Sequence, residues 1–155
     1  MENMMRDGDH LDCIDTWQGG EEHSAEDMGA VWERFQHNIE LAMDKTDRKR
    51  FALPWKTDSA TYLGAAIGEG NLRPYHFIYI DGSHTAPDVL TDACMAWPLL
   101  VNGGLMVFDD YMWGNPRDAL HRPKIAIDAF TNIFGETAEI VHVGYQLVVR
   151  KRNAA

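Results

Sequence analysis

Basic side chains and cysteines are scarce in this sequence. Lysine and arginine number 14 against 24 aspartates and glutamates, which gives a net charge of −10 at pH 7. Because binding to a phosphate backbone needs a basic face, this charge argues against nucleic acid as the main partner and favours a neutral or cationic small molecule. The only cysteines, Cys13 and Cys94, stand in apolar surroundings, so we expect buried free thiols rather than a disulfide or a metal pair.

Long apolar runs are also missing. No stretch approaches the roughly 18 consecutive apolar residues of a membrane-spanning helix, and we find no signal peptide. We therefore expect no membrane partner and take the cytoplasm as the default location. The 155 residues suffice for one domain with a hydrophobic core, and no repeat, low-complexity tract or linker divides them.

The segment Tyr75–Trp113 carries the most informative pattern in the chain. Two short apolar runs in it, Phe77–Ile80 and Leu105–Phe108, are typical of strands. Between them, Ala86–Leu100 is typical of a helix, which Val101–Gly104 closes. The order strand, helix, strand with a connection of this length predicts a parallel pair. Since both runs are apolar almost continuously, we expect the strands to be buried on both faces of the sheet.

Acidic residues follow both of these strands. Asp81 comes directly after the first run, and Asp109 and Asp110 come after the second. The carboxyl ends of parallel strands form the edge at which open sheets bind ligands, so we expect these carboxylates to meet there if the strands are neighbours. Carboxylates so placed repel one another unless a cation or protons intervene, and a hard divalent metal is the simplest resolution. In the alternative interpretation, one acid of the pair caps a turn and the other is solvated.

Before this segment, the chain alternates between strand and helix patterns. Leu11–Ile14 predicts a short buried strand that ends at Asp15, another acid at a strand end. Ala25–Asp47 has a mostly helical periodicity, which we interpret as core packing. Phe51–Trp55 is typical of a strand, and the proline inside it places that strand at a sheet edge.

Two further helices are expected. Thr57–Ser59 is typical of a helix cap, with Asp58 or Ser59 starting a segment that runs to Ile67. Pro123 starts the second helix. We expect its inner face to consist of five apolar residues: Ile125, Ile127, Ala129, Phe130 and Ile133.

The last strands and the first residues complete this interpretation. Glu139–Val143 and Tyr145–Val149, joined at Gly144, predict an antiparallel hairpin at the sheet edge. The loop 114–122 is irregular and stands where a lid or a substrate-contacting segment could lie. Met1–Arg6 has the composition of the tail of a helix.

Three motifs make the chain resemble a known family. They are Cys-Ile-Asp-Thr-Trp at Cys13–Trp17, Ile-Asp-Gly-Ser-His at Ile80–His84 and Phe-Asp-Asp-Tyr at Phe108–Tyr111. In this order they resemble the class I S-adenosylmethionine-dependent methyltransferases, and most closely the small-molecule O-methyltransferase branch. The resemblance covers nearly the whole chain. It implies an α/β fold with a Rossmann-like, mostly parallel sheet and a terminal antiparallel hairpin.

The resemblance implies S-adenosylmethionine as the cofactor. Asp15 would accept hydrogen bonds from the ribose hydroxyls, a role that asks for a fixed carboxylate. Asp58 and Ser59 would lie near the adenine, and Asp81 would also belong to the cofactor site. From the residues alone, Asp15 can also be a turn acid and Asp58 a simple helix cap.

The resemblance also implies a metal and a base. Asp81, Asp109 and Asp110 match the acids that hold magnesium, or another divalent metal, against the hydroxyls of a small-molecule substrate. His84 would take the proton of that hydroxyl as general base, with Asp81 as the other catalytic residue. The deprotonated oxygen would then attack the sulfonium methyl group. A turn histidine bonded to backbone is the alternative interpretation of His84.

One part of the family pattern has no counterpart here, namely the glycine-rich turn after the first strand. We therefore expect a single, N-terminally incomplete methyltransferase-like domain whose first strand is missing. Either the second strand pairs directly with the fourth, or another chain fills the gap, or the chain is a fragment of a longer protein. A homo-oligomer is one of these options.

Two other functions are compatible with parts of this sequence. The first is a non-catalytic fragment that cannot bind the cofactor without the missing strand. The second is an aspartate-phosphorylated receiver domain, which also combines an acid pair with a third acid at strand ends. Here the single acid precedes the pair, and no lysine follows at a suitable strand end, so the order argues against a receiver domain.

Overall fold

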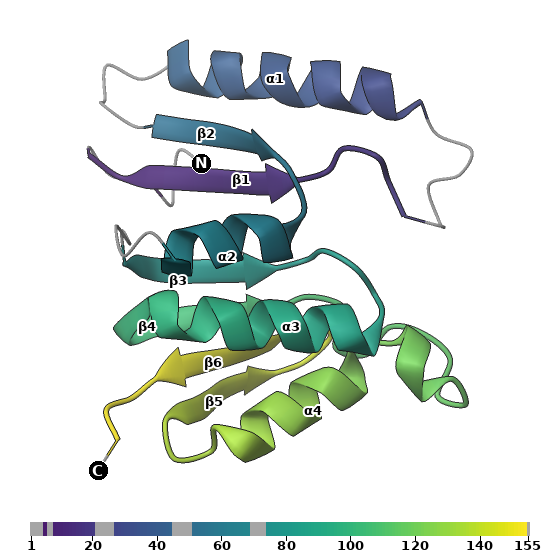
Figure 1. Cartoon of the computed structure of the whole chain (residues 1–155), viewed down its shortest axis with the longest axis vertical. Helices are drawn as coiled ribbons and strands as arrows, with labels where there is room; N and C mark the ends of the chain where they lie inside the picture. Colours follow the sequence, from purple (N-terminus) through teal and green to yellow (C-terminus); the bar gives the residue numbers. More distant parts are fainter. Residues whose placement is uncertain (1–4, 6–7, 21–26, 45–50, 69–73, 155) are drawn as a thin grey trace. The chain divides into compact units, whose positions relative to one another are not determined.

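The computed structural model describes residues 5, 8–20, 27–44, 51–68 and 74–154, and Figure 1 shows their arrangement. Apart from Met5, the helix tail expected at Met1–Arg6 lies outside the described residues. The chain forms two compact units, Met1–Asp58 and Ser59–Ala155. We describe each unit by itself, and the single domain stays a prediction. None of the described helices is both long enough and apolar enough to cross a membrane.

The first unit contains strand β1 (His10–Asp15), helix α1 (Met28–Asp44) and strand β2 (Phe51–Lys56). The two strands pair in parallel, with Asp15 opposite Lys56. The described helix lies within the predicted Ala25–Asp47, and both predicted strands are confirmed. Helix α1 begins after Asp27, whose carboxylate accepts hydrogen bonds from the backbone N–H groups of Gly29 and Ala30 at 3.0 and 3.2 Å. This is the bond that an N-cap residue supplies.

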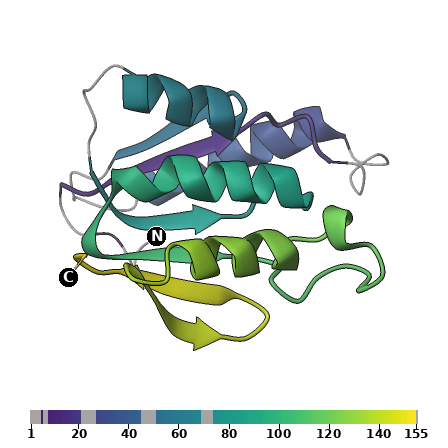
Figure 2. The same ribbon diagram turned by 60° about the horizontal axis from the view of Figure 1, so that its bottom comes forward.

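The second unit holds a four-stranded sheet. Its elements are α2 (Ser59–Gly68), β3 (Tyr75–Ile80), α3 (Ala86–Ala96), β4 (Leu100–Phe108), α4 (Lys124–Ile133), β5 (Ala138–Val143) and β6 (Leu147–Lys151). The strand order is β3-β4-β6-β5, with β3 and β4 parallel and β6 antiparallel to both of its neighbours. Helices α2, α3 and α4 lie on one face of this sheet (Figure 2). The predicted α/β class, with parallel strands and a terminal antiparallel hairpin, is confirmed.

The two units contain two separate sheets. Among the described residues, β1 pairs with β2 only, and β3 pairs with β4 only. The three arrangements expected for a missing strand stay predictions.

The predicted end of the helix before β4 is wrong. We expected a helix over Ala86–Leu100 closed by Val101–Gly104, but α3 ends at Ala96 and β4 begins at Leu100. Trp97–Leu99 continues as one turn of 3-10 helix, and Pro98 within it lacks the N–H group that a further α-helical bond would need. The glycines of β4 lie where its register with β3 shifts. A Cβ on Gly104 would lie only 3.0 Å from the carbonyl oxygen of His76, so the two backbones approach closely there.

Burial on both faces is confirmed for β4 but is wrong for β3. Met106, Val107 and Phe108 are all buried. In β3, by contrast, Phe77 and Tyr79 are 42% and 43% exposed. The helices of the second unit cover one face of the sheet only, so alternate residues of β3 lack a covering layer among the described residues. An apolar composition shows that a strand can be buried, whereas its neighbours decide whether it is.

The core of the second unit lies between the sheet and α3 and α4. Phe130 is fully buried, and its ring centroid lies 5.2 Å from that of Trp97 and 5.5 Å from that of Phe108. The predicted inner face of α4 is partly wrong, because Ile125 and Ile133 are 47% and 73% exposed. A helix buries only a narrow stripe, and five residues spread over nine positions exceed it.

The cysteines are free, as predicted, but they are not both buried. Cys13 is half-buried on β1, and Cys94 is exposed. Cys94 lies between the buried residues Ala93 and Ala96 on α3, where the helical rotation carries it to the outer side. Its apolar neighbours in sequence therefore do not share its surroundings.

The core predicts a clear difference between two substitutions in α4. We expect Phe130→Ala to lower the free energy of unfolding by about 3–5 kcal/mol, because it removes a fully buried ring and leaves a cavity. Ile133→Ala on the same helix serves as control and should change stability by less than about 0.5 kcal/mol, since its side chain is mostly exposed. Urea unfolding followed by circular dichroism measures both, and equal losses would contradict the described packing.

Candidate functional site

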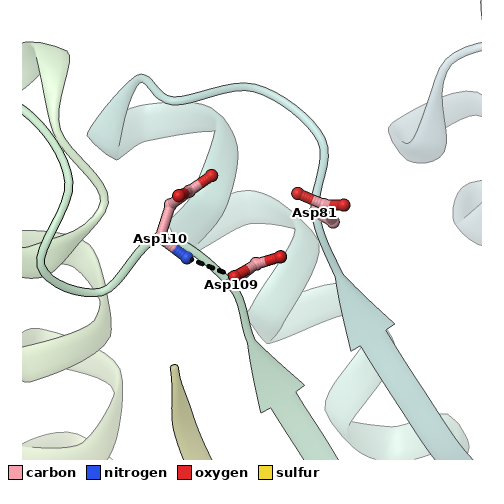
Figure 3. Close-up of side chains that lie close together, drawn as sticks. All are labelled: Asp81, Asp109 and Asp110. Carbon is pink, nitrogen blue, oxygen red and sulfur yellow. Dashed lines mark hydrogen bonds between the residues drawn. The ribbon is translucent and has the colours of Figure 1, made fainter. Parts of the chain in front are cut away.

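Three carboxylates converge where β3 and β4 end. Asp81 follows β3, and Asp109 and Asp110 follow β4 (Figure 3). One ligand oxygen from each of the three lies within 4.8 Å of the others. The backbone N–H of Asp109 donates to the carbonyl of Ile80 at 2.9 Å, which continues the parallel pairing past the strand ends. The register of the two strands therefore brings the predicted acids together.

A tight turn orients the acid pair. Asp110 has φ 54, a left-handed conformation that aspartate tolerates better than most residues. Its backbone N–H donates to Oδ1 of Asp109 at 2.9 Å, and its carbonyl accepts from the N–H of Trp113 at 2.9 Å. The two carboxylates are thereby held beside each other on one short loop.

Tyr111 anchors this loop to α4. Its ring is buried, and its hydroxyl donates to Oδ1 of Asp128 at 2.9 Å. The ammonium group of Lys124 donates to the same hydroxyl at 2.6 Å and to Asp128 at 2.8 Å. These bonds, first to Asp128 and then to Tyr111, raise the pKa of Lys124. The fourth residue of the Phe-Asp-Asp-Tyr motif thus ties the acid-bearing loop to the core.

His84 contacts the acid cluster from the loop between β3 and α3. Its Nε2 lies 2.8 Å from Oδ2 of Asp110, and both side chains are about one-fifth exposed. The imidazole stacks on Trp113, with ring centroids 4.2 Å apart and an interplanar angle of 18°. Helix α3 starts directly after it, where Thr85 caps the helix by accepting from the N–H of Asp88. The structure therefore shows a carboxylate partner for this histidine.

Hydrogen-bond donors that sequence reasoning missed surround Asp109. The hydroxyl of Tyr79 donates to its Oδ2 at 2.5 Å, and the side-chain amide of Gln146 donates to its Oδ1 at 3.1 Å. Burial raises the pKa of Asp109, but the bonds from Tyr79, from the Asp110 backbone and from Gln146 outweigh it, so the net pKa is lowered. Burial and the bond to Asp109 raise the pKa of Tyr79.

Tyr145, beside Gln146, is a further residue that was missed. Its phenol donates to Asp110, and this bond raises the pKa of Tyr145. The turn between β5 and β6 thus reaches both acids of the pair. The sequence offered a signal for Tyr79, because this polar phenol stands one residue before the end of an apolar strand that leads to Asp81. It offered none for Tyr145 or Gln146, which no nearby residue connects with the acids.

A small hollow lies between the two acid-bearing loops. Its lining combines carboxylates, the histidine and a few apolar residues: Ile80, Asp81, Gly82, Ser83, His84, Val89, Phe108, Asp109, Asp110 and Pro123. Oxygen atoms of carboxylates are the ligands that hard divalent cations prefer. The donor set therefore fits magnesium or a similar ion.

Of the predicted cofactor residues, Asp81 lines this hollow, whereas Asp15, Asp58 and Ser59 are not among its lining residues. Asp15 is exposed at the end of β1, and its Oδ1 accepts from the N–H of Trp17 at 2.7 Å, as a turn acid does. Asp58 is exposed directly before α2. Ser59 opens α2, and its hydroxyl donates to Oδ1 of the buried Asp92 at 2.6 Å. Of the predicted site residues, the structure brings together Asp81, Asp109, Asp110 and His84.

Comparison with known proteins identifies the family. A family profile described as "Methyltransferase domain" matches residues 1–111, which is most of the chain. The chain belongs to this methyltransferase family. The matched residues end with the Asp-Asp-Tyr segment, and the β5–β6 turn lies outside them. No curated protein sequence matches the chain.

Solved structures of methyltransferases share the fold. MycE from the mycinamycin biosynthetic pathway, in a complex with Mg, SAH and mycinamycin VI, has a TM-score of 0.57 at 18% identity over 94% of this chain. The O-methyltransferase NovP has a TM-score of 0.56 at 15% identity over 98% of this chain and 74% of its own. A Corynebacterium glutamicum protein has a TM-score of 0.58 at 20% identity, over 94% of this chain and 62% of its own. The chain spans 45% of the length of MycE.

The acid cluster predicts divalent-metal binding by this methyltransferase chain. We expect it to bind Mn²⁺, a paramagnetic substitute for magnesium, and Asp81→Asn, Asp109→Asn and Asp110→Asn each to weaken binding by at least about tenfold. Asp118→Asn is the matched control, because that acid is exposed, outside the cluster and bonded to His121. The signal of free Mn²⁺ in electron paramagnetic resonance gives the affinities. Equal binding by all four variants and the unsubstituted chain would place the metal elsewhere.

Proposed function

We propose that this chain is the core of an S-adenosylmethionine-dependent O-methyltransferase that acts on a hydroxylated small molecule with the help of magnesium or another divalent metal. The observation that carries the proposal is the meeting of Asp81, Asp109 and Asp110 beside His84 at the carboxyl ends of two parallel strands. Membership of the methyltransferase family supports it. Among the solved structures with the same fold, MycE was crystallised with Mg and SAH.

The metal would be held by the three carboxylates at the strand ends. Their negative charges are close together and only partly buried, so a cation there relieves their repulsion. A divalent ion bound by these oxygens lowers the pKa of a hydroxyl that it coordinates. The net charge of −10 suits the recognition of a neutral or cationic substrate rather than an anionic one.

His84 is the base of the proposed reaction. An ionised Asp110 can only accept hydrogen bonds, so Nε2 of the neutral imidazole carries the proton in their 2.8 Å contact. Nδ1 is then the basic atom of the ring. Stacking on Trp113 restricts rotation of the ring, which keeps Nδ1 in one direction.

The reaction transfers a proton and a methyl group. The substrate hydroxyl would give its proton to Nδ1 of His84. S-adenosylmethionine, when bound, would supply the methyl group to the resulting oxygen, so that a C–O bond would form as the C–S bond broke and its electron pair stayed on sulfur. The products are a methyl ether and S-adenosylhomocysteine. Because the protein takes no covalent part, its contribution is position and electrostatics.

Asp15 and Asp58 in Met1–Asp58, and Ser59 and Asp81 in Ser59–Ala155, stay the predicted cofactor residues of the two units. The bond from the Trp17 N–H fixes the carboxylate of Asp15, and a fixed carboxylate suits the two hydroxyls of a ribose. The bond to Asp92 likewise fixes Ser59 at the start of α2. Asp81 belongs to both sites, so it would stand between the metal and the cofactor.

A non-catalytic fragment is the second candidate. The observation that favours it is that the acid cluster lies wholly within Ser59–Ala155, whereas the predicted cofactor residues fall in both units. Such a fragment would keep the acid cluster in Ser59–Ala155 but would not bind the cofactor by itself. Cofactor binding and turnover therefore separate the two candidates. A cytoplasmic location and a homo-oligomer belong to the proposal as expectations.

Cofactor binding is tested with S-adenosylhomocysteine and isothermal titration calorimetry, with and without magnesium. We expect binding by the unsubstituted chain and about 10–100-fold weaker binding by Asp15→Asn, because hydrogen bonds to a charged group contribute about 1.5–3 kcal/mol. Glu40→Gln, an exposed residue of α1, is the control and should bind unchanged. Absence of binding by the unsubstituted chain would favour the non-catalytic fragment.

The role of His84 is tested by methyl transfer from labelled S-adenosylmethionine to a panel of hydroxylated small molecules. We expect His84→Gln to lower kcat by about 10²–10⁴-fold while Mn²⁺ and S-adenosylhomocysteine still bind, since a general base acts on the chemical step. His121→Gln serves as control, because that imidazole is exposed and bonded to Asp118. Full activity of His84→Gln would remove this histidine from the mechanism.

A further inference from the structure

Asp109 accepts hydrogen bonds from three donors. Its Oδ1 accepts from the Asp110 backbone at 2.9 Å and from the Gln146 amide at 3.1 Å, and its Oδ2 accepts from the Tyr79 hydroxyl at 2.5 Å. The same amide of Gln146 donates to the Tyr79 hydroxyl at 2.6 Å. The two side chains and the carboxylate therefore form a closed triangle. In it the phenol donates one bond and accepts one, and the amide uses both of its N–H groups.

These bonds leave one direction for a further ligand. A carboxylate oxygen has two acceptor positions, and those of Oδ1 are both filled. Oδ2 has one filled by Tyr79 and one remaining. In Figure 3 the dashed bond from the Asp110 backbone ends on Oδ1, and the other oxygen of Asp109 points toward Asp81. The remaining position of Oδ2 thus belongs to the side on which the acids converge.

We infer that Tyr79 and Gln146 are positioning residues that hold Asp109 so that it binds the cation through Oδ2 alone. This inference rests on the proposed function and adds to it residues that lie outside the Asp-Gly-Ser-His and Phe-Asp-Asp-Tyr segments. Outer-shell hydrogen bonds of this kind orient ligating carboxylates, and their loss typically costs about 10–100-fold in metal affinity. Gln146 comes from the β5–β6 turn, beyond the residues that match the family profile.

The turn between β5 and β6 places Gln146 beside Asp109. Gly144 donates its N–H to the carbonyl of Gln146 at 2.9 Å, which closes the turn between β5 and β6. A Cβ on Gly144 would lie 2.8 Å from Nε2 of the exposed His142 side chain, which can move aside. With Tyr145 bonded to Asp110, consecutive residues of the turn address both acids of the pair.

The triangle adds little to the stability of the fold. Tyr79 is 43% exposed, and hydrogen bonds in contact with water contribute little to the free energy of unfolding. The main effect of the triangle is therefore to orient the carboxylate of Asp109. This separates a positioning role from a structural one, because the two roles change different measured quantities.

The test compares Tyr79→Phe and Gln146→Met with Tyr75→Phe in the full 155-residue chain. Each of the first two variants keeps the size of the side chain and removes its donors. Tyr75 lies at the other end of the same strand, where its hydroxyl bonds to that of Tyr62 at 2.8 Å, so it is a matched control. Mn²⁺ affinity is measured by electron paramagnetic resonance, and the melting temperature is measured in the presence of a chelator.

We expect about 10–100-fold weaker Mn²⁺ binding by Tyr79→Phe and Gln146→Met and unchanged binding by Tyr75→Phe. The loss of Mn²⁺ binding free energy in the double variant Tyr79→Phe/Gln146→Met should be smaller than the sum of the losses in the two single variants, because both side chains act through one carboxylate. Melting temperatures of Tyr79→Phe and Tyr75→Phe should be similar.

Other outcomes overturn the inference in distinguishable ways. If the unsubstituted chain binds Mn²⁺ and Tyr79→Phe and Gln146→Met bind it equally well, the positioning role is wrong and the metal site stands. If Tyr75→Phe weakens binding as much as Tyr79→Phe, the effect is a general loss of structure. If the unsubstituted chain binds no Mn²⁺, the metal part of the proposed function fails, and the positioning role fails with it.

Discussion

The repulsion between three neighbouring carboxylates is the constraint on which the site depends. Asp81, Asp109 and Asp110 meet because β3 and β4 run in parallel and their pairing continues into the Asp109 N–H bond to Ile80. A fold gains nothing in stability from placing like charges side by side. Their convergence at the carboxyl ends of parallel strands therefore indicates a functional site that binds a cation.

The surrounding structure compensates for this charge and holds it in place. Donors reach the acid pair from four parts of the second unit: the Asp110 backbone, the phenol of Tyr79 in β3, His84 on the loop before α3, and the β5–β6 turn. Tyr111 ties the acid-bearing loop to α4 through Asp128. The cluster is thus prepared by the fold before any ligand arrives, and such preparation lowers the cost of reorganisation during a reaction.

The likeness to MycE and NovP lies in the fold, at identities of 18% and 15%. A shared fold does not establish a shared activity, so the argument for methyl transfer depends on the site together with family membership. The acid cluster and His84 lie within Ser59–Ala155, whereas Asp15 lies within Met1–Asp58. The proposed metal site is therefore contained in one unit, whereas the predicted cofactor residues fall in both.

The sequence by itself determined where strands end and acids begin. An apolar run that stops at a carboxylate is a local signal, and it located Asp15, Asp81, Asp109 and Asp110. Two strand-like runs joined at Gly144 likewise located the terminal hairpin. Local signals failed where packing decides. The exposure of Cys94 depends on how α3 packs, and the partners of Asp109 stand 30 and 37 residues away in the chain. Only the tertiary structure could assign them, because distance along the sequence carries no information about which side chains meet in space.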